Sequence, residues 1–271
     1  MQLEGAVAVV TGAASGIGRS LARALALEAG GVVVVADIDG AGAEAVAAEI
    51  ATEAGPDGRA GFAAGFAAGI DVTDEDAVVA LIEQVESSLG PIELWCGNAG
   101  ISHLGGVERP DDEWNRVWDV NVMAHVIACR HLVPRWVERG SGHLLVTASA
   151  AGLLTNLGTA SYAVTKHAAV GLAEWIAITH GDDGVRVSCL CPQGVRTTMT
   201  ENEGAVAVDQ VRALGLMEPE DVAAVTLEAL RQDRFLILPH PEVATYEARR
   251  AGDRQRWLDG MRRMQRRLLG S

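Results

Sequence analysis

The stretch TGAASGIG at residues 11–18 decides the fold of this chain. It follows the apolar run AVAVV at residues 6–10 and leads into a segment with helical spacing. A strand that ends in Gly-x-x-x-Gly-x-Gly before a helix makes a phosphate-binding turn, because the helix N-terminus offers unpaired N–H groups to an anion. Gly12 permits the tight exit from the strand, Gly16 lets a pyrophosphate approach, and Gly18 lets the helix pack close to the sheet. The stretch predicts a dinucleotide site.

Asp37 ends the next apolar run, GVVVVAD at residues 31–37, about 20 residues after the glycines. A carboxylate at this place accepts hydrogen bonds from a ribose 2′-hydroxyl and repels a 2′-phosphate. No arginine stands close behind the glycines or Asp37, where the neighbours are Ala13, Ala14, Ile38 and Asp39. The sequence therefore favours NAD over NADP. A helix or turn cap is the alternative role of Asp37.

Apolar runs alternate with helical patterns along the whole chain. The expected strands are 6–11, 31–37, a weaker one ending in 69–72, 92–98, 142–149, 185–191 and 235–239. The expected helices are 17–28, 41–53, 74–88, 111–138 and 161–180. Runs without period-2 alternation are buried on both faces, and strand–helix alternation gives parallel βαβ units. We predict an α/β, Rossmann-type, doubly wound parallel seven-stranded sheet with helices on both faces.

The domain organisation follows from the length of this pattern. We expect residues 1–240 to form one dinucleotide-binding and catalytic domain, with a substrate lid near 198–217. Residues 241–271 are expected to be a helical extension of that domain. In this extension the residues Trp257, Met261, Met264 and Leu268 fall at helical spacing. Such a helix packs on its own body or on a partner chain, or closes the active site of a neighbouring subunit.

Charge and composition exclude several partners. The formal net charge is −14, yet residues 247–271 carry eight arginines against three acids, a net of +5, which leaves −19 on the rest. So acidic a body repels nucleic acid. No apolar run reaches the roughly 20 residues of a membrane helix, and the N-terminus has no basic start or cleavage site. The cysteines lack metal-ligand spacing, so we predict buried thiols, no metal and a cytoplasmic protein.

Five further motifs follow the glycine loop in order. They are NAG at 98–100, Asn121 in WDVNVMAH, Ser149 in TASAAG, Tyr162 and Lys166 in YAVTK, and PQGVRT at 192–197. With the loop TGxxxGxG, this set resembles the short-chain dehydrogenase/reductase superfamily, in its compact single-domain branch, over roughly residues 5–240. Ser149 lies thirteen residues before Tyr162, the usual family distance. Two departures stand out: Gly97 replaces the first asparagine of NNAG, and Gln193 replaces a glycine.

Tyr162 and Lys166 are four residues apart on an expected helix and share one face. An ammonium near a phenol favours the phenolate and lowers the phenol pKa from about 10. Such a tyrosine can take a proton from an alcohol or return one to a carbonyl oxygen, while Ser149 holds the same oxygen. The resemblance implies that Lys166 also holds ribose and that Asn121 orders a water in a proton relay. The hydride step belongs to the nicotinamide.

The resemblance also implies a set of cofactor-binding residues. These are Gly12, Ser15, Gly16, Ile17, Gly18, Asp37, Asp71, Val72, Asn98, Ala99, Gly100, Tyr162, Lys166, Val195 and Thr197. In this assignment Asp71 meets the adenine, with a helix cap as its alternative role. Val195 and Thr197 contact the nicotinamide carboxamide.

We therefore predict an NAD-dependent oxidoreductase that interconverts a secondary alcohol and a ketone. The segments 101–106, 153–158 and 198–217 offer a mostly apolar pocket with no basic cluster apart from Arg196, which favours a small uncharged substrate. The resemblance implies a homodimer or homotetramer built around the long helices. The alternative is a non-catalytic NAD-binding sensor or scaffold protein, which would not need the Ser–Tyr–Lys set. An extended-branch epimerase would need a larger C-terminal domain.

Overall fold

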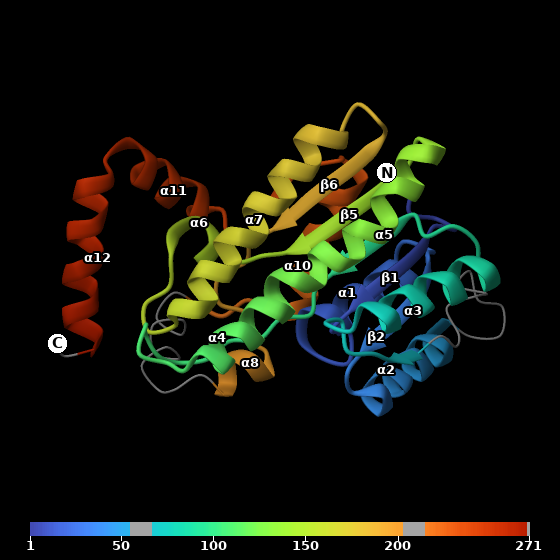
Figure 1. The fold of residues 1–271 in the computed structure, drawn as a ribbon, viewed down its shortest axis with the longest axis horizontal. Helices are drawn as coiled ribbons and strands as arrows, with labels where there is room; N and C mark the ends of the chain where they lie inside the picture. Colours follow the sequence, from blue (N-terminus) through green and yellow to red (C-terminus); the bar gives the residue numbers. More distant parts are fainter. Residues whose placement is uncertain (55–66, 203–214, 270–271) are drawn as a thin grey trace.

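The computed structural model describes residues 1–54, 67–202 and 215–269. Its strands form one seven-stranded sheet in the order β3-β2-β1-β4-β5-β6-β7, with every neighbouring pair parallel (Figure 1). The strands are β1 (Val7–Thr11), β2 (Val32–Asp37), β3 (Ala67–Gly69), β4 (Leu94–Gly97), β5 (Gly142–Thr147), β6 (Val185–Leu190) and β7 (Leu236–Ile237). The predicted doubly wound parallel sheet is confirmed.

Helices cover both faces of this sheet. In the first half of the chain they are α1 (Gly16–Leu27), α2 (Gly40–Ala54), α3 (Glu75–Ser88), α4 (Asp111–Trp118), the π-helical turn η1 (Asp119–Met123) and α5 (Ala124–Arg139). In the second half they are α6 (Ala151–Leu154), α7 (Ala160–His180), α8 (Thr198–Asn202), α10 (Pro219–Arg231), α11 (Glu242–Gly252) and α12 (Arg254–Leu269). The turn η1 interrupts the continuous helix that the sequence predicts over 111–138.

Two hydrophobic cores lie on opposite faces of the sheet because neighbouring strand residues point to opposite sides. In β1, Val7 and Val9 pack with residues of α3, α5 and α7. Ala8 and Val10 pack instead with residues of α1, α2 and α10. All four side chains are buried, which explains why this strand shows no alternation of apolar and polar residues.

The third strand, β3, ends at Gly69, the first residue of the stretch 69–72 in which the sequence places its end. Ile70 still donates a backbone hydrogen bond to Asp37. The chain then turns, because Asp71 accepts hydrogen bonds from the backbone and hydroxyl of Thr73. Asp74 caps α3 by accepting a hydrogen bond from Ala77. The expected strand residues therefore form the loop that faces the cleft.

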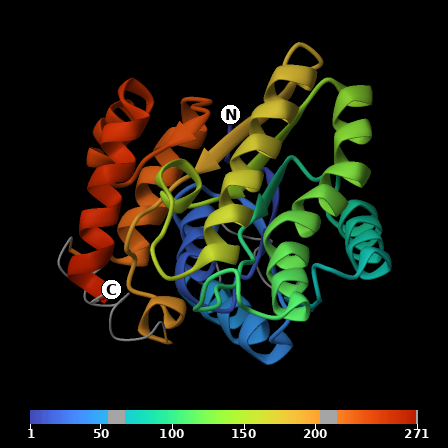
Figure 2. The same cartoon turned by 60° about the vertical axis from the view of Figure 1, so that its left-hand side comes forward.

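The C-terminal extension forms two helices, α11 and α12, separated at Asp253. They lie at one end of the molecule, with α12 outside α11 (Figures 1 and 2). Of the expected lid over 198–217, the structure describes 198–202 and 215–217, and the remainder lies outside the described residues. Among the described helices, none is both long enough and apolar enough to cross a membrane.

Candidate active site

A cavity of about 970 Å³ opens at the carboxyl ends of the strands, where the order of the sheet reverses between β1 and β4. This switch point is where open α/β sheets bind ligands. Most residues expected at the cofactor or catalytic site line it, namely Gly12, Ser15, Gly16, Ile17, Asp37, Asp71, Val72, Asn98, Ala99, Gly100, Ser149, Tyr162, Lys166, Val195 and Thr197. The other two, Gly18 and Asn121, do not line the cavity.

The glycine loop is locked to the loop after β4. Asn98 donates from Nδ2 to the carbonyl oxygens of Thr11 and Gly12 at 3.1 and 3.2 Å, and Thr11 Oγ1 accepts from the backbone of Asn98 and Ala99. Gly12 has φ +63°, and a Cβ there would lie 2.8 Å from the Ala99 Cα. A Cβ on Gly18 would lie 2.1 Å from the Gly12 oxygen. Both positions therefore require glycine.

The N-terminus of α1 faces this cavity. Ser15 is the N-cap residue, and its side chain makes no capping hydrogen bond. A Cβ on Gly16, where φ is +53°, would lie 3.0 Å from Thr197 Cγ2. The first N–H groups of the helix thus have no capping side chain, and Gly16 itself adds none. This is the arrangement that a pyrophosphate requires.

Asp37 is held beside the glycine loop by two backbone donors. Its Oδ2 accepts from Ala14 and its Oδ1 from Asp39, both at 2.9 Å. The carboxylate therefore acts as a turn cap and also lines the cavity. The two roles expected for Asp37 are compatible.

Asp71 lies farther along the same wall, beside Arg116. Its Oδ2 is 3.5 Å from the Arg116 guanidinium, and its Oδ1 accepts from Thr73. Although burial raises the pKa of Asp71, the Thr73 hydrogen bonds and the guanidinium bring it below the ordinary value. The carboxylate is charged at neutral pH.

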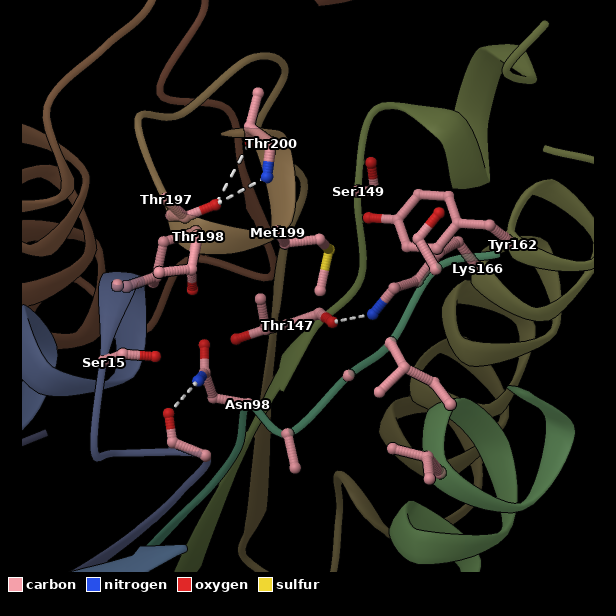
Figure 3. A pocket seen from close by; sticks show the side chains of 18 of the residues that line it. Ser15, Asn98, Thr147, Ser149, Tyr162, Lys166, Thr197, Thr198, Met199 and Thr200 are labelled. Carbon is pink, nitrogen blue, oxygen red and sulfur yellow. Dashed lines mark hydrogen bonds between the residues drawn. The ribbon is translucent and has the colours of Figure 1, made fainter. Parts of the chain in front are cut away.

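Ser149, Tyr162 and Lys166 line the opposite wall, and Figure 3 shows the hydroxyl of Tyr162 directed toward Ser149. Ser149 follows β5, and its Oγ accepts from the backbone of Ala151 at 3.1 Å. Tyr162 and Lys166 come from the first turns of α7, with the Lys166 ammonium 5.6 Å from the centre of the phenol ring. Lys166 donates to the Thr147 carbonyl at 2.8 Å, which fixes its direction.

Lys166 is the sole lysine in the sequence, so the other 21 basic residues are arginines. Its side chain is buried, with 2% of the residue exposed, and burial lowers its pKa to about 8. No salt bridge reaches it from the described residues. Unlike arginine, this ammonium can respond to a neighbouring phenolate by changing its protonation.

Asn121 lies behind this wall in the π-helical turn η1, a distortion that is frequent at functional sites. Its amide nitrogen donates to the Ile101 carbonyl and to Thr165 Oγ1, and its oxygen accepts from the Ile101 N–H. A Cβ on Gly100 would lie 3.3 Å from Lys166 Nζ and 3.4 Å from Asn121 Oδ1. The missing side chain leaves space between the two groups.

Comparisons with known proteins agree with this geometry. A family model described as short chain dehydrogenase matches residues 6–206, well over half of the chain. The chain belongs to the short-chain dehydrogenase family. A 1-deoxy-11-beta-hydroxypentalenate dehydrogenase from Streptomyces exfoliatus is 38% identical over 248 residues, which cover 89% of this chain and 86% of that protein. A meso-2,3-butanediol dehydrogenase from Serratia marcescens is 36% identical over 230 residues, covering 83% and 87%.

A solved structure gives the same result for the fold. The short chain dehydrogenase/reductase from Burkholderia phymatum, solved in complex with NAD, superposes with a TM-score of 0.82 at 30% identity. The match covers 94% of this chain and 96% of that one. This short-chain dehydrogenase is therefore an oxidoreductase with a nucleotide-binding Rossmann fold.

The departure of this dehydrogenase from the NNAG motif has a packing reason. A Cβ on Gly97 would lie 2.5 Å from the Nδ1 of His125. His125 is 2% exposed, one helical turn after Asn121, and burial lowers its pKa to about 3. A neutral imidazole thus fills the space that a side chain at position 97 would need. At the second departure, the Gln193 backbone donates to His240 Nδ1, and Gln193 lines the cavity.

The rim of the dehydrogenase cleft contains residues that the sequence did not single out. Arg109, Glu113 and Arg116 line it together with Leu104, and the two arginines come from outside the segments that the sequence predicts to form the pocket. The reason is that α4 folds back over the cleft mouth. Arg109 pairs with Glu113 through two hydrogen bonds, and Arg196 pairs with Glu218 at 2.8 Å. The i, i+4 spacing of Arg109 and Glu113 predicts that they pair but does not indicate their place at the cleft.

The described residues hold no group of three or more His, Cys, Asp or Glu side chains placed to bind a metal ion. The cysteines Cys96, Cys129, Cys189 and Cys191 are buried and form no disulfide.

Proposed function

We propose that this dehydrogenase uses NAD to interconvert a secondary alcohol and a ketone. One observation carries the proposal: the glycine loop and the residues Ser149, Tyr162 and Lys166 line two walls of the same cavity. A nicotinamide cofactor supplies or accepts the hydride when bound. The cofactor would be held by the lining residues described above. The uncapped N-terminus of α1 and the absence of a side chain on Gly16 fit its pyrophosphate.

The proton chemistry is assigned to the opposite wall. In oxidation, the Tyr162 phenolate takes the proton from the substrate hydroxyl, and in reduction the phenol returns it to the carbonyl oxygen. Ser149 donates a hydrogen bond to the same oxygen, and its own position is fixed by Ala151. The Lys166 ammonium favours the phenolate. Asn121 and the space beside Gly100 provide the route along which a water would carry the proton onward.

The preference for NAD rests on Asp37. Two backbone N–H groups hold its carboxylate at the end of β2, beside the exposed Ile38. A 2′-phosphate placed there would meet a negative charge. The related structure from Burkholderia phymatum was solved with NAD, which supports the same choice.

The substrate class rests on the rim. Each arginine at the cleft mouth is paired with a carboxylate, Arg109 with Glu113 and Arg116 with Asp71, so the described rim offers no uncompensated cation to an anionic substrate. This supports a small uncharged alcohol or ketone. Relatives named for a hydroxypentalenate and for a butanediol are dehydrogenases of hydroxyl compounds. Because the first of these names is that of an acid, hydroxy acids belong in the test.

The remaining expectations stay proposals. We propose that residues 1–240 act as one domain, with the lid near 198–217 and the extension 241–271. We propose a homodimer or homotetramer built on α5 and α7, where Trp175 and Ile178 are 59% and 84% exposed. Four buried free thiols suit a reducing cytoplasm.

The experiment is calorimetric titration of the purified protein with NAD and with NADP, followed by a panel of secondary alcohols, ketones and hydroxy acids read at the nicotinamide absorbance. We expect NAD to bind more tightly and an uncharged member of the panel to turn over. Tighter binding of NADP would contradict the role of Asp37. NAD binding without turnover on the panel would favour the sensor or scaffold alternative.

A further inference from the structure

The last helix of the chain, α12, is attached to the body at one end. Trp257, in its first turn, packs against the core under α11. Met261, one turn on, is half-buried, and Met264 is 43% exposed. Trp257, Met261 and Met264 thus form an apolar stripe along α12 that packs on the body at Trp257 and is exposed to solvent at Met264. Figures 1 and 2 show α12 at the outer end of the molecule.

The other face of α12 is strongly basic. Residues 254–269 contain six arginines and one acid, a net charge of +5. Arg262 pairs with Asp259 in the same helix. The other arginines form no salt bridge within the described part of the chain, and they are Arg254, Arg256, Arg263, Arg266 and Arg267. Five cations on one exposed helix repel each other, so this face is suited to an acidic partner.

The matching surface lies on the same molecule, at the mouth of the cleft. Residues 104–119, which we call the rim segment, contain five acids and two arginines, a net charge of −3. Both arginines are already paired, as described above. The acids Asp111, Asp112 and Asp119 are exposed and make no salt bridge with described residues. The segment also exposes apolar side chains, since Val107 is 87%, Leu104 45% and Trp118 40% exposed.

We propose that α12 of one copy of this chain docks on the rim segment of a second copy. Within one chain both surfaces remain open, because α11 and Trp257 fix α12 with its arginine face directed outward. Two copies related by a two-fold axis satisfy both surfaces twice, with arginines against acids and exposed Met264 against exposed apolar side chains. Since Leu104 and Arg109 line the cleft, the docked helix forms part of its mouth.

The charge of the rest of the chain favours this occupant over others. Outside residues 247–271 the chain carries −19, which repels both nucleic acid and an anionic membrane surface. The same −19 attracts the arginine face of another copy. A second copy is thus the partner whose chemistry fits α12 as well as the body behind it.

The experiment is cross-linking between two single-cysteine variants, Met264→Cys on α12 and Val107→Cys on the rim segment. The four native cysteines are buried, so the engineered thiols are the exposed ones. The two variants are co-expressed with different tags and treated with a short bismaleimide. Because each chain carries one exposed thiol, a linked pair must join two copies. Val225→Cys, at an exposed valine of α10, replaces Val107→Cys in the matched control.

We expect the Met264–Val107 pair to cross-link at least about tenfold more than the Met264–Val225 pair. We expect that excess to be lost in 1 M salt, where charges are screened within about 3 Å, and in the Arg263→Glu, Arg267→Glu background. Equal cross-linking in both pairs, or an excess that ignores salt and charge reversal, would overturn the proposal. So would arginine-dependent binding of the protein to anionic vesicles or DNA. The assay needs neither cofactor nor turnover, so its result is independent of the proposed function.

Discussion

The inner wall of the cleft and its rim are built in different ways. The inner wall comprises the glycine loop, the loop 98–100 and the start of α7, where buried groups are hydrogen-bonded and an added methyl group would meet backbone atoms. The rim comprises residues 101–119 and 198–200, where side chains such as Leu104 and Arg109 stand partly in solvent. The inner wall fixes one geometry, whereas the rim presents replaceable side chains.

This difference separates the catalytic geometry that a family has in common from the substrate that each member recognises. Hydride and proton transfer need reacting groups held within a fraction of an ångström, which buried backbone contacts provide. Substrate choice needs a surface that can change without loss of the fold, and exposed side chains provide that. If the comparison is right, substitutions in the inner wall have large effects and rim substitutions have small ones.

The largest effect is expected for Tyr162→Phe. Removing the phenol oxygen removes the proton donor and acceptor, so kcat falls about 10²–10⁴-fold, while the fold is retained. Steady-state kinetics on the substrate found in the panel give the measurement. The chain has one other tyrosine, Tyr246, which is half-buried on α11, and Tyr246→Phe is the matched control with near-normal kcat. Equal losses in both variants would break the comparison, since the effect would then not belong to the inner wall.

Gly18→Ala is the next largest change and tests the wall by stability. The new Cβ would lie 2.1 Å from the Gly12 oxygen and 2.5 Å from the Asn98 amide nitrogen. Because one of these is backbone, the loop must move, at a cost of about 3 kcal/mol in the free energy of unfolding. Urea denaturation measures it. Gly171→Ala in α7, where the Cβ meets nothing within 4 Å, should stabilise the protein by about 0.5–1 kcal/mol.

The sequence predicts the inner wall well for a physical reason. Close backbone contacts leave few residue types possible, so Gly12, Gly18 and Asn98 appear as a recognisable pattern with fixed spacing. The strands are equally predictable, because burial on both faces leaves continuous apolar runs such as residues 31–37. The third strand ends at the first residue of the predicted stretch 69–72, because Ile70, although buried like a strand residue, already leads into the turn at Asp71.

The rim was predicted poorly because its position depends on how α4 folds back over the cleft. Nothing in the local pattern of Arg109 or Arg116 says that each reaches the cavity. The sequence also did not predict that the His125 ring occupies the space beside Gly97, since these residues are far apart in the sequence and meet only in the packed structure. Contacts across the cleft depend on tertiary packing, and they cannot be predicted from the pattern of a single sequence.

The third prediction uses the sole lysine, Lys166, to measure how well the inner wall excludes water. Protein labelled with ¹³C at the lysine ε-carbon should give one lysine side-chain signal, with a midpoint near pH 8 for Lys166. The unfolded chain binds this proton up to about pH 10.5. Between the two values the unfolded state holds more protons, so this group makes the free energy of unfolding rise with pH, by about 3 kcal/mol in total.

The matched variant is Lys166→Met, which removes the titrating group. The thiols of the unfolded chain also titrate in this range, so the informative quantity is the difference in stability between the variant and the wild type at each pH. The free energy of unfolding of the variant minus that of the wild type should be about 3 kcal/mol larger at pH 7 than above pH 10.5. A lysine midpoint near 10.5, or a difference that does not change with pH, would show that Lys166 is solvated and that the wall is more open than the comparison requires.

The smallest effect is expected at the rim. Leu104 is 45% exposed, so Leu104→Ala should change the free energy of unfolding by less than about 0.5 kcal/mol and leave NAD affinity unchanged. Leu94, fully buried in β4, is the matched control, and Leu94→Ala should cost about 2–5 kcal/mol. Because Leu104 lines the cavity, its truncation should still alter KM within the substrate panel. A Leu104→Ala protein as unstable as Leu94→Ala would mean that the rim is part of the core, and the separation between a fixed wall and a variable rim would then fail.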